Sequence, residues 1–137
     1  MAWRARLVGE RAERSHTFTE ADVEAFASLS GDRNPLHFDA EFVAATRFGR
    51  PIIHGGLTTA MFNALVAEQL PGPGSVFLHQ EWDYPAPVFI GDTVTAFVEV
   101  LESRADKPIT RLRCVARRHD GTVVLEGQSL VYTARPD

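Results

Sequence analysis

The stretch that decides the fold is IIHGGLTTAMFNALVAEQL, residues 52–70. Five apolar residues recur in it at helical spacing: Leu57, Ala60, Met61, Ala64 and Leu65. Phe62 and Val66 add apolar surface on the opposite side, where charges are few. Because a helix that is apolar nearly all round is a buried helix, we expect a central helix here. It ends near Leu70, before the breaker sequence Pro71-Gly72-Pro73-Gly74.

Downstream of this helix the apolar period changes to two, which is typical of strands. Four strands are expected, at residues 75–84, 93–102, 109–118 and 122–133. Asp120-Gly121 between the last two indicates a hairpin. Since one buried helix precedes a run of long antiparallel strands, the sequence predicts an α+β fold. A curved antiparallel sheet would wrap around the central buried helix.

Upstream, the sequence predicts short helices that carry a polar loop. Thr19 can cap a helix that Gly31 ends, and Asp39 can cap a second one that reaches about residue 46. Between them lies Asp32-Arg33-Asn34-Pro35-Leu36-His37, where Pro35 fixes its own φ and keeps Asn34 out of the helical region. The chain must bend there, which lets Asp32 and His37 converge. A carboxylate facing an imidazole can hold and activate a water, so the segment indicates a hydratase or dehydratase.

Composition and charge narrow the function. The 137 residues suit a single domain, 1–137, and 45% of them are hydrophobic. A net charge of −4 disfavours binding to nucleic acid, and no apolar run is long enough to span a membrane. The only cysteine is Cys114, and His16, His79 and His119 are scattered, so we expect no metal site. Without a signal peptide at the N-terminus, the expected location is the cytoplasm.

These motifs together resemble the MaoC-like (R)-specific enoyl-CoA hydratases, which have the hotdog fold. The family's signature, Asp-x-Asn-Pro-x-His, is intact as Asp32, Asn34, Pro35 and His37. The similarity extends over nearly the whole chain and includes Arg50-Pro51-Ile52-Ile53-His54-Gly55 and Pro87-Val88-Phe89-Ile90-Gly91-Asp92. The complete six-residue pattern, followed by His54-Gly55 before an apolar helix, is much more specific than an Asp and a His alone.

The resemblance implies roles for individual residues. Asp32 and His37 match the catalytic pair, and Gly55 matches the residue whose backbone N–H binds the thioester carbonyl. Asn34, Gly56 and Asn63 are candidates for substrate binding, although Asn34 is better suited to holding the bend through side-chain to backbone bonds. The position of Asn63 is expected to influence acyl-chain length. His54 is expected to be structural and to close backbone bonds at the helix start.

The resemblance also implies partners and leaves alternatives open. The substrate would be an acyl-CoA, bound in a tunnel between the subunits of a homodimer or of a dimer of dimers. No cofactor is expected beyond the CoA or acyl-carrier thioester of the substrate. The alternatives are a (3R)-hydroxyacyl-ACP dehydratase, a hotdog subunit active only with a partner, and an acyl-CoA thioesterase. The third of the four expected strands carries Arg111, Arg113 and Arg117. These arginines and Lys107 either form a solvated face or bind the CoA phosphates.

Overall fold

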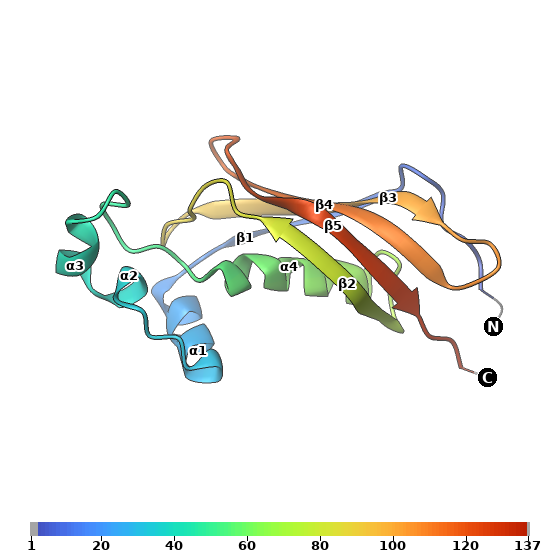
Figure 1. The fold of residues 1–137 in the computed structure, drawn as a ribbon, viewed down its shortest axis with the longest axis horizontal. Coiled ribbons are helices and arrows are strands. Elements are labelled where there is room, and N and C mark those ends of the chain that lie inside the picture. The colour runs from blue at the N-terminus through green and yellow to red at the C-terminus, as the bar shows by residue number, and fades with distance from the viewer. Residues whose placement is uncertain (1–2, 137) are drawn as a thin grey trace.

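A five-stranded antiparallel sheet curves over one long helix in the computed structural model, which describes residues 3–136 (Figure 1). The strands are β1 (Arg11–Thr17), β2 (Ser75–Asp83), β3 (Thr93–Ser103), β4 (Ile109–Arg118) and β5 (Val123–Thr133). Their order in the sheet is β1-β3-β4-β5-β2. The helices are α1 (Glu20–Ser30), α2 (Pro35–Phe38), α3 (Ala40–Ala44) and α4 (Gly55–Glu68). The predicted sheet around a central helix is confirmed, while the ends of the predicted domain, residues 1–2 and 137, lie outside the described residues.

Strand β1 was not expected from the sequence. It pairs antiparallel with β3, from Arg11 opposite Glu99 to Thr17 opposite Thr93. The hydroxyls of Thr17 and Thr93 are 2.6 Å apart, so the strands are also joined by their side chains. Most residues of β1 are exposed because the strand lies at the edge of the sheet. An edge strand of this kind needs no alternating apolar pattern, and hydrophobic periodicity therefore could not reveal it.

The short helices follow local rules. Thr19 and Asp22 form a reciprocal capping box at the start of α1, and Gly31 ends it with a left-handed φ of 82°. Asn34 then caps α2, because its side-chain oxygen accepts a hydrogen bond from the Leu36 N–H at 3.0 Å. The prediction that Asn34 holds the bend is confirmed. The helical turn of α2 was not expected, although Pro35 is suited to a first helical position.

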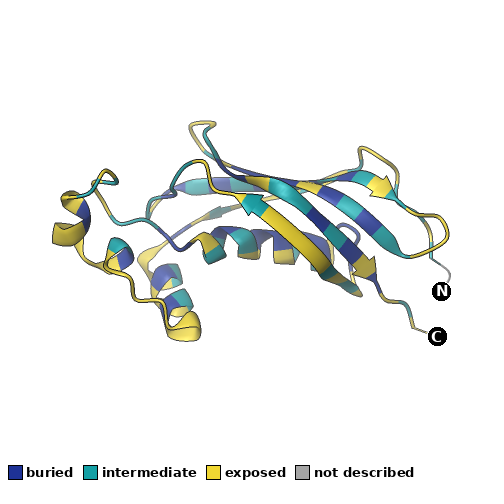
Figure 2. Ribbon diagram, viewed as in Figure 1, coloured by how far each residue is buried: buried dark blue, intermediate teal, exposed yellow. Residues whose placement is uncertain are grey.

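Helix α4 buries one face against the sheet rather than its whole surface (Figure 2). Its buried residues are Thr58, Met61, Phe62, Leu65 and Val66. The ring of Phe62 stacks on Trp82 of β2 with centroids 5.5 Å apart. On the other side, Gly55, Ala60 and Asn63 are exposed in the single chain. The expectation that Ala60 belongs to the buried stripe is therefore wrong: the stripe that faces the sheet includes Phe62 and Val66, which were assigned to the opposite side.

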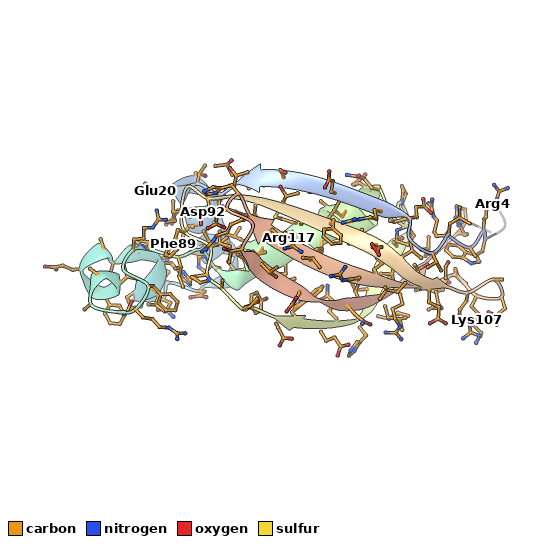
Figure 3. All side chains as sticks on the ribbon, turned by 90° about the horizontal axis from the view of Figure 1, so that it is seen from above. Arg4, Glu20, Phe89, Asp92, Lys107 and Arg117 are labelled. Carbon is orange, nitrogen blue, oxygen red and sulfur yellow. The ribbon has the colours of Figure 1, made fainter. Side chains whose placement is uncertain are left out.

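Strand β4 separates its side chains as predicted. Leu112, Cys114 and Ala116 are fully buried, whereas Arg113 and Arg117 are exposed. Figure 3 shows Arg117 on the outer face of the sheet, with α4 behind it, and Lys107 at the end remote from α1–α3. Arg117 therefore lies on the face of the sheet opposite α4, and contact of Lys107 or of these arginines with the CoA phosphates stays a prediction. Among residues 3–136, no helix is both long and apolar enough to cross a membrane.

Candidate active site

Asp32 is held by the loop that follows α1. The Ser30 hydroxyl accepts a hydrogen bond from the Asp32 N–H at 3.1 Å. The Asp32 Oδ1 atom accepts one from the Asn34 N–H, also at 3.1 Å. These two bonds orient the carboxylate, so that its second oxygen, Oδ2, faces His37. Because 47% of the Asp32 side chain is exposed, this oxygen remains accessible to water and substrate.

His37, on α2, presents a defined nitrogen to Asp32. Its Nδ1 lies 2.7 Å from the carbonyl oxygen of Ile52. A carbonyl oxygen only accepts, so Nδ1 carries the proton and Nε2 of the neutral ring is an acceptor. That Nε2 lies 3.8 Å from Asp32 Oδ2, which is too far for a direct hydrogen bond. The structure thus brings Asp32 and His37 together as predicted, at a separation that one water can bridge.

His54 supports this pair, a role that sequence reasoning missed. Its Nε2–H donates to the carbonyl oxygen of Asp32 at 2.9 Å, and its ring stacks on that of His37 with centroids 3.9 Å apart. It makes no side-chain hydrogen bond to the first turn of α4. The expected structural role of His54 is confirmed, but its side chain bonds the backbone carbonyl of Asp32 and not the start of α4. The only signal in the sequence was its place just before Gly55, and the contact with Asp32 spans 22 positions.

The two glycines at the start of α4 have different neighbours. A Cβ on Gly55 would lie 2.9 Å from Cε1 of Tyr84, and a Cβ on Gly56 would lie 2.3 Å from Cζ of Phe26. Neither position has room for a side chain. The first N–H groups of a helix have no partner within it, and the helix dipole is positive there. Gly55 can therefore offer its N–H to an oxygen. At position 56 the contact with Phe26 already explains why the residue is glycine. A role of Gly56 in substrate binding stays a prediction.

A cavity of about 390 Å³ opens beside this helix start. His37, Gly55 and Tyr84 line it together, and Arg47 is also part of the lining. Thr58 and several apolar residues complete its wall, among them Ile53, Val88 and Val124. Burial raises the pKa of the Tyr84 phenol above its ordinary value, so this hydroxyl stays protonated at neutral pH. The cavity therefore joins an acid–base group, a helix N-terminus and an apolar wall.

The remaining predicted site residues do not line this cavity. Asn34 is occupied in capping α2, and Asn63 is exposed on the outward side of α4. The proposed influence of Asn63 on acyl-chain length stays a prediction.

Asp32, His37 and His54 also form the one described cluster that could hold a metal ion, with ligand atoms all within 4.8 Å of one another. Sequence reasoning had looked for such a cluster only among the other histidines. Two ring nitrogens are already used, since His37 Nδ1 and His54 Nε2 both bind backbone carbonyls. The absence of a metal site stays a prediction.

Comparison with known proteins identifies the family. Residues 8–123 match the family model described as MaoC like domain, which covers most of the chain. This chain belongs to the MaoC-like domain family. Its sheet and central helix are the hotdog fold, and the family contains hydro-lyases.

Relatives of this MaoC-like chain are similar over most of their length. The chain is 47% identical to an (R)-specific enoyl-CoA hydratase of Aeromonas caviae over 124 residues, which is 90% of this chain and 92% of the relative. It is 42% identical to a 3-hydroxybutyryl-CoA dehydratase of Methylorubrum extorquens, covering 87% and 75% of the two chains. The solved (R)-hydratase of A. caviae, described as involved in PHA biosynthesis, superimposes with a TM-score of 0.90 at 45% identity. The match covers 94% of this chain and 98% of the A. caviae chain.

Proposed function

We propose that this chain is an (R)-specific enoyl-CoA hydratase, which adds water reversibly to trans-2-enoyl-CoA to give (R)-3-hydroxyacyl-CoA. The observation that carries the proposal is the pair of acceptor atoms, Asp32 Oδ2 and His37 Nε2, 3.8 Å apart beside the start of α4. The 47% identity to the A. caviae hydratase supports the substrate class.

The two acceptors define the orientation of a water between them. A neutral His37 with its proton on Nδ1 accepts at Nε2, and the carboxylate of Asp32 also accepts. A bridging water must then donate both of its protons to the protein. Its oxygen lone pairs point away from the pair, toward the substrate. This is the orientation needed for attack on the β-carbon of an enoyl thioester.

The N-terminus of α4 can stabilise the negative charge that develops on the thioester oxygen. As the water oxygen bonds to the β-carbon, the electrons of the double bond move toward the thioester carbonyl. The Gly55 N–H, at the positive end of the helix dipole, can donate to that oxygen. One such donor is worth roughly 10²–10³-fold in rate. A side chain at position 55 would push the Tyr84 ring aside, and glycine lets the ring pack directly on the start of α4.

The protons balance without any further reagent. Asp32 takes one proton from the water as the C–O bond forms, and this same proton then passes to the α-carbon on the same side, with assistance from His37. The other hydrogen of the water, held at His37 Nε2, stays on the hydroxyl of the product. One O–H bond and one π bond are lost, while one C–O and one C–H bond form. Both residues return to their starting states, so the proposed chemistry needs neither a redox cofactor nor a metal.

We further propose that the active form is a homodimer, in the cytoplasm. The outward side of α4 carries Gly55, Ala60 and Asn63, which leave a flat, weakly charged helix face exposed. Strand β2 is an edge strand, and its Val76 and Leu78 are more than half exposed. An unpaired edge with exposed apolar residues favours pairing with a second copy. Light scattering coupled to size-exclusion chromatography should give a mass of two or four chains.

The observation that favours a second function is a set of more distant relatives. The chain is 31% identical to a mitochondrial 3-hydroxyacyl-[acyl-carrier-protein] dehydratase of Arabidopsis thaliana over 126 residues. The acyl chemistry is the same in both directions, so the catalytic pair does not distinguish the carriers. Competition between crotonyl-CoA and the crotonyl carrier-protein thioester in one assay separates them, and the CoA thioester should be the better substrate.

The test of the main proposal is loss of the enoyl-thioester absorbance with crotonyl-CoA and analysis of the product's configuration. Asp32→Asn and His37→Ala should each lower kcat roughly 10²–10⁴-fold. Asp106→Asn is the matched control, because Asp106 is exposed and pairs with Arg104 at the surface. A loss below tenfold in Asp32→Asn would contradict the mechanism. A folded wild type that is inert alone but active with a partner would favour the partner-dependent subunit.

A further inference from the structure

Tyr84 is the one hydroxyl-bearing aromatic residue that lines the cavity with His37 and Gly55. It follows β2 and reaches back over the start of α4. Its Cε1, Cζ and hydroxyl oxygen lie 2.9, 3.2 and 3.4 Å from the position of a Cβ on Gly55. The ring therefore packs directly on the glycine that offers its N–H to the thioester. Within residues 3–136 the Tyr84 hydroxyl has no hydrogen-bond partner, so its proton is available to a ligand.

The Tyr84 hydroxyl and the Gly55 N–H are close enough to share an acceptor. A Cβ and the nitrogen of the same residue are about 2.5 Å apart, so the phenol oxygen is at most about 6 Å from the Gly55 nitrogen. Each hydrogen bond spans about 2.9 Å between heavy atoms. One oxygen between the two donors can therefore accept from both. The ordinary pKa of a tyrosine phenol, near 10, already keeps the hydroxyl protonated at neutral pH, and burial raises the pKa of Tyr84 further.

We propose that Tyr84 is a second donor to the thioester carbonyl oxygen, completing an oxyanion site with the Gly55 N–H. The inference rests on the proposed hydratase function, because it assigns a further role in that reaction. Tyr84 transfers no proton. Its O–H bond stays intact while the hydrogen bond to the oxygen shortens as negative charge accumulates there. A donor of this kind acts more strongly on the transition state than on the bound substrate, so it affects kcat more than KM.

Tyr84→Phe tests the hydroxyl while it keeps the ring that packs on Gly55. With crotonyl-CoA we expect kcat to fall at least tenfold and KM to change less than about threefold. Tyr132→Phe is the matched control, since Tyr132 lies on β5, is partly exposed and does not line the cavity. It should retain the wild-type kcat. Equal kcat for Tyr84→Phe and wild type, or an effect on KM alone, would overturn the proposal.

A second readout separates this inference from the proposed function. Butyryl-CoA lacks the double bond and cannot be hydrated, so its carbonyl stretching frequency can be measured in the complex. Wild type and Tyr132→Phe should lower that frequency by the same amount, and Tyr84→Phe should lower it less. If the carbonyl frequency of butyryl-CoA is the same in the Tyr84→Phe complex as in the wild-type complex, the donor role is refuted even if hydration is confirmed. If wild type does not hydrate enoyl-CoA at all, the hydratase proposal fails first, while the frequency still reports on the oxyanion site.

Discussion

Replacement of His54 by phenylalanine tests whether the hydrogen bond from His54 to Asp32 matters for activity more than for the stability of the fold. A phenyl ring is flat like imidazole but larger by one ring atom, so His54→Phe keeps an aromatic ring against His37, where the centroids are 3.9 Å apart, and against Phe26, where they are 4.8 Å apart. It removes one interaction, the hydrogen bond from Nε2–H to the Asp32 carbonyl oxygen. The variant therefore loosens the loop that carries the Asp32 carboxylate and keeps an aromatic ring between His37 and Phe26.

The structure indicates a small stability change. A lost neutral hydrogen bond costs about 0.5–1.5 kcal/mol in net stability. The Nδ1 atom of His54 is buried without a partner, and its removal relieves a desolvation cost of about 1 kcal/mol or more. These two effects oppose each other, and fitting the larger phenyl ring at this buried position adds a cost of about 1 kcal/mol or more. The free energy of unfolding should therefore fall by less than about 3 kcal/mol. The melting temperature should then fall by less than about 10 °C.

The effect on activity should be much larger. A displacement of about 1 Å at a reacting group costs roughly 10²-fold in rate, and Asp32 loses one of its fixed contacts. We expect kcat with crotonyl-CoA to fall between about 10- and 100-fold, with KM within about threefold. The assays are urea unfolding and steady-state hydration, with His119→Phe, at an exposed histidine, as control. A stable His54→Phe variant with the wild-type kcat would refute the reasoning.

Three further predictions concern other parts of the molecule. Gly127→Ala should destabilise the protein by about 3 kcal/mol or more in urea unfolding, because the new Cβ would meet the Glu81 carbonyl oxygen at 1.9 Å and part β2 from β5. Burial raises the pKa of the Cys114 thiol from 9.0 to about 11, so at pH 8 a coloured disulfide reagent should react with it only after unfolding. The stability linked to this thiol is present below pH 9 and is lost as the pH rises through about 11. Incubation with EDTA should leave kcat within about twofold of its starting value if the proposed acid–base chemistry is sufficient, whereas a large loss restored by Zn²⁺ would assign a metal to the cluster of Asp32, His37 and His54.

Features governed by neighbouring residues could be read from the sequence. The caps at Thr19 and Gly31, the Asn34 side-chain bond and the hairpin at Asp120-Gly121 each depend on residues within a few positions of one another. The approximate limits of α4 and of four strands followed from apolar periodicity. The convergence of Asp32 and His37 was predictable for the same reason, because a proline-induced bend acts over five positions.

Features that depend on contacts between distant segments required the tertiary structure. Strand β1 has no apolar pattern because most of its residues are exposed at the edge of the sheet, where only Ala12 packs against the core. The buried side of α4 is set by the concave sheet, which receives Phe62 and Val66 and leaves Ala60 outside. His54 reaches Asp32, and Tyr84 reaches Gly55, only because the chain folds back on itself. The local motif thus determined which residues could activate water, while the packing of segments distant in sequence decided that His54 contacts the Asp32 loop and that Tyr84 packs on Gly55.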